Sequence, residues 1–310
     1  MNFNRRDFIG FAAAAGALGT AGCATSTSAD DLPRGRMLFG ICVGNNFKTV
    51  AEMKELGYDF FEGSVAGALI PTKGEDDWKR QKDEILAAGL PIRSCNGFLP
   101  GTFRLTGPNA SWDEPLAYAE TVCRRADEVG LTCIVFGSGG ARNVPGDMCA
   151  KNREDRPKVE RGVEQFTEFC EKLAARIVGC KVTIVIEPLC PNESNIINYV
   201  WQGLQIVEKV DSPRIQQLAD LYHMAQGKEP AASIIQAGSR LKHCHIATPK
   251  SRQAPGLDEP GVLLDYFKAL RRIGYTGGVS CECGWGPKGT DRREARIKAL
   301  ALMKKWAGMA

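Results

Sequence analysis

The sequence predicts a single-domain (β/α)8 TIM barrel, an α/β fold, over residues 37–310. Short apolar runs alternate with amphipathic stretches eight times, at about 34 residues per unit, close to the roughly 250-residue size of such barrels. The apolar runs are continuous rather than alternating, which indicates strands buried on both faces, as in a parallel sheet. Carboxylate and histidine residues that could bind a metal or transfer protons follow several different strands. In a doubly wound open sheet we would expect such residues to cluster near one switch point.

The strands and helices follow in order from these patterns. We expect strands at residues 37–44, 58–65, 91–98, 132–139, 182–189, 215–224, 242–249 and 277–285. We expect helices at residues 47–57, 76–90, 113–130, 157–180, 195–210, 230–241, 261–274 and 291–308, the first of them ending at Gly57. The segment GSGGAR at 137–142 lacks the G-x-G-x-x-G pattern of a dinucleotide site, so we expect a glycine-rich loop there.

The first 36 residues are expected to precede the barrel. Residues 1–23 contain the twin arginines Arg5 and Arg6, followed by a short run rich in Ala and Gly. This pattern is typical of a twin-arginine export signal and is too short for a membrane span. The sequence TAGC also resembles a lipoprotein cleavage site with Cys23 as the lipidated residue, and residues 24–36 resemble a flexible tether. We therefore expect an exported protein, either periplasmic or held at the membrane by a lipid anchor on Cys23.

The charge distribution of the chain argues against one class of partner. The formal net charge is +4, and basic and acidic residues interleave, so we expect no nucleic-acid partner. A homo-oligomer remains compatible with the sequence.

The 12 cysteines have no regular spacing, and the sequence leaves undecided whether loop cysteines such as Cys149 and Cys190 form a disulfide. Six others lie inside apolar runs, where cysteine acts as a small core residue: Cys42, Cys95, Cys133, Cys244, Cys281 and Cys283.

Four polar residues stand near the ends of successive predicted strands: Glu187, Asp220, His245 and Glu282. Their spacing matches single strand-helix repeats, so we expect the side chains to converge at the carboxyl end of the barrel. Three carboxylates buried without a counter-charge would be strongly destabilising, and a divalent cation would remove that cost. One imidazole with three carboxylates suits Mn²⁺, Mg²⁺ or Co²⁺, and Zn²⁺ is also compatible. The alternative is a set of ordinary polar residues at loop starts.

The three histidines of the chain lie close together in the sequence. His243 and His245 have the same strand parity and so face the same side of their strand. We expect the outer one, His245, to be the metal ligand, and His243 to lie one layer deeper as a packing or supporting group. His223 follows Asp220 by three residues on the same predicted strand, and we interpret it as a substrate-contacting or proton-handling residue.

The order of the motifs IEPL, DLYHM, HCHIA and CECGW resembles the xylose isomerase-like barrel superfamily. The likeness is strongest to sugar isomerases and epimerases of the ketose 3-epimerase and hydroxypyruvate isomerase type. It implies that one divalent ion is held by the four strand-end residues, and that Glu187 and Glu282 form an acid/base pair. The implied reaction is proton abstraction beside a carbonyl, through an enediolate intermediate, on a small carbohydrate substrate.

The resemblance also implies residues that bind the substrate. His223 and Glu193 match positions that contact the substrate in such enzymes, and Arg252 is the arginine nearest to a substrate-binding position after the seventh strand. We expect Glu62, at the end of the second strand, to line the same pocket.

Three other functions use the same scaffold. A metal-dependent lyase or hydratase acting on oxidised (3-keto) glycosides would share the enolisation and then expel a β-substituent. A non-catalytic carbohydrate-binding lipoprotein would have no need for both glutamates. An endonuclease with three zinc ions would need further histidines on the second and third strands, and the sequence YDFFEGSV and PIRSCNGF contains none.

Overall fold

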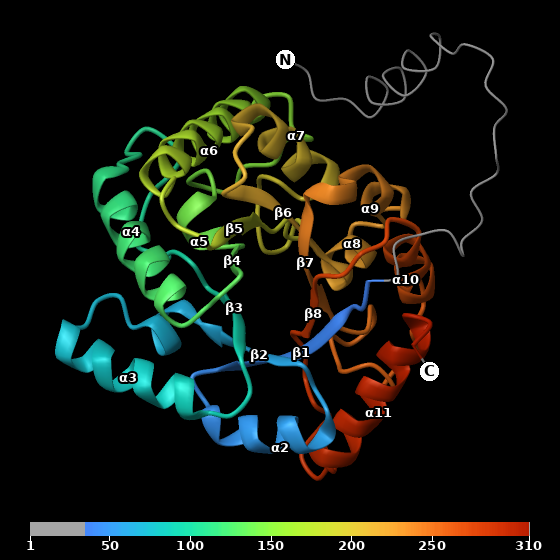
Figure 1. Cartoon of the computed structure of the whole chain (residues 1–310). Coiled ribbons are helices and arrows are strands. Elements are labelled where there is room, and N and C mark those ends of the chain that lie inside the picture. The colour runs from blue at the N-terminus through green and yellow to red at the C-terminus, as the bar shows by residue number, and fades with distance from the viewer. Residues whose placement is uncertain (1–34, 310) are drawn as a thin grey trace, which may run out of the picture. The chain divides into compact units, whose positions relative to one another are not determined.

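The computed structural model describes residues 35–309, and within them eight parallel strands close into one barrel in sequence order (Figure 1). The last strand pairs with the first, so the sheet has no open edge. The predicted single-domain (β/α)8 barrel is confirmed. The strands are β1 Leu38–Gly44, β2 Phe60–Ser64, β3 Ile92–Asn96, β4 Cys133–Phe136, β5 Thr183–Ile186, β6 Ile215–Asp220, β7 Leu241–Ile246 and β8 Gly278–Cys281.

Helices connect successive strands and surround the barrel (Figure 1). The first, α2, ends before Gly57, whose φ of 81° is the left-handed conformation that commonly terminates helices. The helices are α2 Val50–Leu56, α3 Glu75–Ala87, α4 Asp113–Glu128, α5 Gly139–Arg142, α6 Arg156–Arg176, α7 Val200–Val210, α8 Leu221–Gln226, α9 Ala232–Ala237, α10 Leu263–Arg272 and α11 Arg292–Trp306, with the short turns η2 Phe47–Thr49, η3 Val65–Leu69 and η4 Gly238–Arg240.

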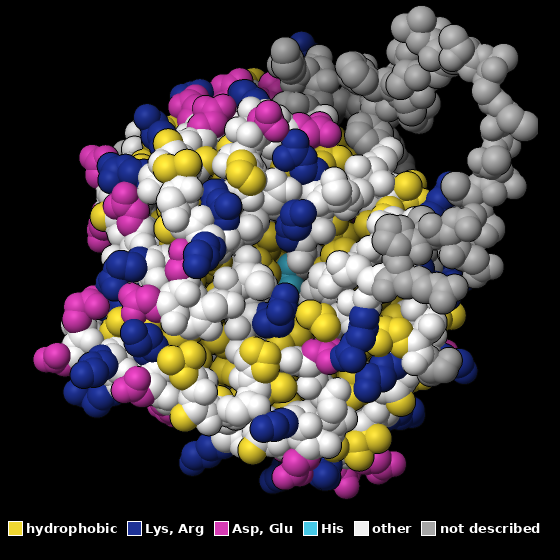
Figure 2. Space-filling view, in the orientation of Figure 1, with side chains coloured by type: hydrophobic (Ala, Val, Ile, Leu, Met, Phe, Trp, Pro, Cys, Tyr) yellow, Lys and Arg dark blue, Asp and Glu magenta, His cyan; other side chains and the backbone are white. Residues whose placement is uncertain are grey.

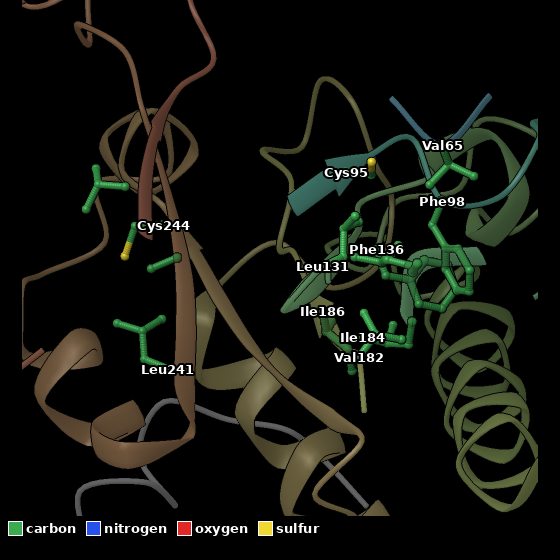
Figure 3. Packing of buried hydrophobic residues seen from close by; sticks show 14 of the residues in the cluster. Val65, Cys95, Phe98, Leu131, Phe136, Val182, Ile184, Ile186, Leu241 and Cys244 are labelled. Atoms are coloured by element: carbon green, nitrogen blue, oxygen red, sulfur yellow. The ribbon is translucent and has the colours of Figure 1, made fainter. Parts of the chain in front are cut away.

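The side chains of each strand alternate between the helical shell and the barrel interior. On β5, Ile184 and Ile186 pack in the main hydrophobic core, where Figure 3 shows them near Phe136. Val185 instead belongs to a separate small cluster inside the barrel. Because side chains repeat every second residue along a strand, Glu187 shares the inward direction of Val185. The same alternation directs Asp220, His245 and Glu282 inward.

A bulky ring fills the interior near the amino ends of the strands. A β-carbon at Gly40 would lie 2.5 Å from the ring of Phe60, and one at Gly278 would lie 2.9 Å from it. The same β-carbon at Gly278 would lie 3.0 Å from Nδ1 of His243. Glycine at these two strand positions therefore makes room for Phe60 and His243.

Three local features differ from the expected elements. The segment GSGGAR is not entirely a loop, because the short helix α5 begins at Gly139. The sixth strand ends at Asp220, which caps α8, so His223 lies in the first turn of a helix and not on the strand. Residues Val65–Leu69 form a π-helical turn that no periodicity indicated.

The predicted export signal (residues 1–23) and most of the tether (residues 24–36) lie outside the described residues and stay predictions. Within residues 35–309, none of the helices combines the length and the apolar character needed to cross a membrane. The eleven cysteines of this part are all free, including Cys149 and Cys190. Of the six expected core cysteines, four are buried, while Cys42 and Cys283 are partly exposed.

Candidate active site

Four side chains from neighbouring strands converge at the carboxyl end of the barrel. Asp220 ends β6 and His245 lies on β7, while Glu187 and Glu282 directly follow β5 and β8. Each offers one ligand atom, and these atoms all lie within 4.8 Å of one another. The structure thus brings together all four residues that the sequence placed at strand ends.

His245 is the centre of this group. Its Nδ1 atom lies 3.0 Å from Oε1 of Glu187, 3.8 Å from Oε2 of Glu282 and 3.9 Å from Oδ2 of Asp220. The opposite ring nitrogen, Nε2, lies 2.9 Å from Oε1 of Glu62. Burial opposes a charge on this ring, but the carboxylates of Glu62 and Glu282 and the hydrogen bonds raise the pKa of His245 well above its usual value.

Glu187 is positioned by the loop that follows β4. A β-carbon at Gly137 would lie 2.3 Å from Oε2 of Glu187, so a side chain there would displace the carboxylate. Arg142, which is fully buried, donates from Nη1 to the carbonyl oxygens of Glu187 (2.8 Å) and Phe136 (3.1 Å). This guanidinium therefore ties the ends of β4 and β5 together at the residue that carries the Glu187 carboxylate.

Asp220 divides its two oxygens between structure and site. Oδ1 accepts the backbone N–H groups of Tyr222 (2.7 Å) and His223 (3.1 Å), which caps the amino end of α8. Oδ2 faces the ring nitrogens of His223 and His245, at 3.8 and 3.9 Å. The cap fixes the carboxylate, so Oδ2 is held toward the centre of the site.

Glu282 is the most accessible of the four, with 26% of its side chain exposed. Its Oε1 accepts from Nδ2 of Asn96 (2.9 Å), and its Oε2 accepts from Nη2 of Arg252 (2.9 Å). Burial, reinforced by the charges of Glu187 and Asp220 and opposed by His245, raises the pKa of Glu282 to about 7. Burial and the neighbouring carboxylates together therefore disfavour ionisation of Glu282.

Glu62 lies in the layer beneath the four residues and does not line the cavity, contrary to the expectation from sequence. It is fully buried, and its two oxygens accept from four side chains at 2.6–2.9 Å: Ser94, His243, His245 and Ser280. Burial opposes its ionisation, but the charges of His245 and His243 hold the pKa of Glu62 well below its usual value. Glu62 therefore orients His245 from behind, as carboxylates orient metal-binding histidines.

A cavity of about 300 Å³ opens above the four residues. Figure 2 shows a hollow near the centre of this barrel face, with a histidine side chain visible at its bottom. Arg252 and Glu193 lie at the cavity and are joined by a 2.7 Å ion pair, and Arg252 also stacks over the ring of Tyr222. The lining residues are Asn96, Gly97, Gly137, Ser138, Gly139, Glu187, Leu189, Glu193, His223, Arg252 and Glu282.

His223 presents an N–H group toward the cavity. Its Nδ1 accepts the backbone N–H of Cys190 at 3.2 Å, so in the neutral ring the proton is on Nε2. Nε2 is buried without a hydrogen-bond partner and lies 3.8 Å from carboxylate oxygens of Glu193 and Asp220. A buried donor without a partner at a cavity wall is suited to a ligand oxygen.

The donor set fits a divalent cation. Three carboxylates face one imidazole nitrogen, and the Oδ2 atom of Asp220 lies 3.9 Å from it, beyond hydrogen-bonding distance. Hard and borderline ions prefer such oxygen-rich sets with one imidazole. A bound cation would favour the ionised form of Glu282, whose pKa is raised by burial and by the neighbouring carboxylates.

This geometry can be set beside known proteins. A family model described as a xylose isomerase-like TIM barrel matches residues 50–306. The chain belongs to this family. The resemblance inferred from the four strand-end motifs is thereby confirmed at the level of the family.

Proteins with named activities match this chain along much of its length. A probable ketose 3-epimerase of Synechocystis sp. is 27% identical over 195 residues, which cover 63% of this chain and 64% of that protein. An L-ribulose 3-epimerase of Methylomonas sp. is 26% identical over 275 residues, which cover 83% of this chain and 90% of that protein. The first match therefore spans slightly less than two thirds of that relative.

Solved structures share the barrel. D-psicose 3-epimerase from Clostridium cellulolyticum, with D-tagatose, superposes with a TM-score of 0.73 at 18% identity, over 87% of this chain and 99% of that one. The 3-keto-D-glucoside 4-epimerase from E. coli superposes with a TM-score of 0.70 at 20% identity, over 87% and 100%. At these identities the likeness establishes the fold.

Sequence reasoning missed two residues that shape the site. Asn96 ends β3 and contacts Glu282, and the position rule that found Glu187 could have found it too. Arg142 carried no such signal, because its role depends on its burial at the end of α5, which the motif GSGGAR does not indicate.

Proposed function

We propose that the protein is a divalent-metal-dependent sugar isomerase or epimerase that acts on a free ketose. The observation that carries this proposal is the convergence of Glu187 and Glu282, from β5 and β8, on one cavity with His245 and Asp220. The relatives named as ketose and L-ribulose 3-epimerases support a sugar substrate.

Glu187, Asp220, His245 and Glu282 would hold the cation, with Mn²⁺, Mg²⁺ or Co²⁺ preferred and Zn²⁺ also compatible. When bound, such an ion polarises a carbonyl and an adjacent hydroxyl group, which acidifies the C–H bond between them. His245 must then be neutral at Nδ1, and Glu62 keeps the other ring nitrogen hydrogen-bonded.

The two glutamates supply the acid and the base. One carboxylate removes the proton beside the carbonyl, and the enediolate is then reprotonated by the other from the opposite face, which inverts the carbon centre. Return of the proton to the neighbouring carbon isomerises the sugar instead. Asn96 and Arg252 hold the two oxygens of Glu282, which fixes the carboxylate for this transfer.

The polar groups at the cavity wall position the sugar. The Nε2–H group of His223 is free to donate to a substrate oxygen. Beside it, Arg252 and Glu193 form a charged pair that can exchange their mutual contact for sugar hydroxyl groups.

Solvent-exchange kinetics test the chemistry. The full chain, loaded with Mn²⁺, is incubated with free ketoses in D2O, and deuterium incorporation at carbon is followed by NMR. We expect incorporation that falls about 10²–10⁴-fold in Glu282→Gln, whereas Glu164→Gln, an exposed carboxylate on α6, serves as the matched control. Turnover of a 3-keto glycoside with loss of a β-substituent, and no exchange into any free ketose, would assign the lyase reaction instead.

Metal analysis tests the site separately. A preparation purified without chelators and supplied with Mn²⁺ should contain about one ion per chain, the number expected for a single ligand set. Absence of a bound ion would refute the metal site.

From residues 1–23 alone we also propose export by the twin-arginine route, either to the periplasm or to a lipid anchor on Cys23. Replacing Arg5 and Arg6 by Lys should retain the protein in the cytoplasm.

A further inference from the structure

Two cysteines meet at the end of the barrel opposite the candidate active site. Cys123 lies on α4, and Cys180 lies in the short segment between α6 and the start of β5. Glu187 follows the other end of β5, so the length of that strand separates the thiols from the catalytic carboxylates.

Hydrogen bonds on both sides of Cys123 hold the two segments together. Asp127, four residues later on α4, accepts the two backbone N–H groups that directly follow Cys180, at 2.8 Å each. Glu120, three residues before Cys123, pairs with Arg176 at the end of α6 at 3.2 Å. Residues three and four apart lie on one helical face, so these contacts bracket Cys180 against Cys123.

The contacts of Asp127 and Glu120 bring the segment of Cys180 against the face of α4 that carries Cys123, and the two thiols differ in character. Cys123 is buried, whereas Cys180 is partly exposed. The hydrogen bond from Cys123 lowers the pKa of Cys180 to about 7, although burial and the charge of Asp127 oppose this, and Arg214 assists it. The same hydrogen bond and burial raise the pKa of Cys123 well above its usual value. Cys180 is therefore the accessible nucleophile and Cys123 the thiol behind it.

We propose that Cys123 and Cys180 form an intramolecular disulfide when the chain meets a thiol–disulfide oxidant, and that this bond clamps α4 to the entry of β5. The bond would join positions 123 and 180, which are 57 positions apart in the sequence. Closing a loop of this size restricts the unfolded chain considerably. The expected result is a more stable barrel with an unaltered active site.

The reaction balances with a low-molecular-weight or protein disulfide as oxidant. The thiolate of Cys180 attacks one sulfur of the donor disulfide, which releases the first donor thiolate and leaves a mixed disulfide on Cys180. Cys123 then loses its proton and attacks the sulfur of Cys180, which releases the second donor thiolate. Two protein thiols are oxidised to one disulfide, and the donor is reduced to two thiols. In the oxidising compartment that residues 1–23 predict, the bond would persist.

Peptide mapping with matched variants tests the proposal. The full chain is equilibrated with oxidised or reduced glutathione, remaining thiols are alkylated, and peptides are analysed by mass spectrometry. We expect a linked Cys123–Cys180 peptide only in the oxidised sample, and a Tm roughly 5–10 °C higher than in the reduced sample. Cys180→Ser should abolish this difference, whereas Cys149→Ser, an exposed cysteine elsewhere, should retain it.

Three results would overturn the proposal. The first is alkylation of both Cys123 and Cys180 in the oxidised sample. The second is glutathione on Cys180 without linkage to Cys123. The third is an equal Tm difference between oxidised and reduced samples in wild type and Cys180→Ser. Cys180 is partly exposed, so its serine variant should fold, and Cys123→Ala offers a second variant if needed.

Discussion

Glu62 and Glu282 lie in neighbouring layers of one barrel interior, but the protein holds them in opposite ways. Glu62 is fully buried and accepts hydrogen bonds from two serines and two histidines. Glu282 is partly exposed, and beside Asn96 and Arg252 it faces two further carboxylates. The pKa of Glu62 is accordingly held well below its usual value, whereas that of Glu282 is raised to about 7.

The comparison shows that burial alone does not decide the charge of a carboxyl group. Burial raises the pKa in both cases, and the neighbours determine the outcome. The lower layer is a satisfied network that stabilises the barrel. The upper layer is an unsatisfied one, suited to a cation and a substrate.

The largest effect is expected for Glu282→Gln, which tests the upper layer. If Glu282 moves the proton as proposed, kcat/KM for ketose epimerisation should fall about 10²–10⁴-fold when its carboxylate is lost. The free energy of unfolding should be unchanged or higher in metal-free protein, because a crowded carboxylate is removed. Steady-state kinetics and urea unfolding measure the two quantities. A marked loss of stability would contradict the division between layers.

Glu62→Gln tests the lower layer. We expect the free energy of unfolding at pH 7 to fall by about 3 kcal/mol, because His243 and His245 lose their anionic partner and one accepting oxygen is replaced by an NH2 group that faces donors. Urea unfolding of this variant beside Glu282→Gln gives the measurement. Equal stabilities of the two variants would refute the comparison.

Glu229 sharpens the comparison, because it is buried among neutral donors. It accepts the backbone N–H of Val200 at the start of α7, and burial raises its pKa to about 6. A carboxyl group whose pKa is raised on folding stabilises the protein below the unfolded value of 4.5, and this contribution is lost as the pH rises through 6. Relative to Glu229→Gln, the wild type should lose about 2 kcal/mol between pH 4 and pH 7. Urea unfolding across this range measures it, and a constant difference would exclude the shift.

The smallest effect is expected at His223. Gln can reproduce a donor at the position of Nε2, whereas Asn can reproduce only the acceptor at Nδ1 that binds Cys190. If the free Nε2–H group binds the sugar, His223→Gln should keep a kcat/KM about 10-fold above that of His223→Asn, the value of one hydrogen bond. Equal losses in both variants would assign His223 a packing role.

The barrel was predictable because its signals are local and repeated. Continuous apolar runs marked the strands. Strand parity and the spacing of the repeats were enough to place four residues at one end of the barrel: Glu187, Asp220, His245 and Glu282. The same parity placed His243 one layer below His245, where the structure has it. The sequence-based predictions failed where local signals are absent. His223 was expected on a strand but lies in α8, because the helix cap at Asp220 ends β6.

The fold class and the four converging residues could be inferred from the chain alone, because each depends on a period along it. What each polar group faces became visible only in the folded barrel. Contacts across the barrel placed Glu62 behind His245, directed Arg142 at the backbone of Glu187, and brought Cys123 beside Cys180 rather than Cys149 beside Cys190. Such contacts join residues many positions apart, so no periodic pattern in the sequence predicts them. The charge states of the buried groups depend on these contacts and are therefore equally unpredictable from the sequence.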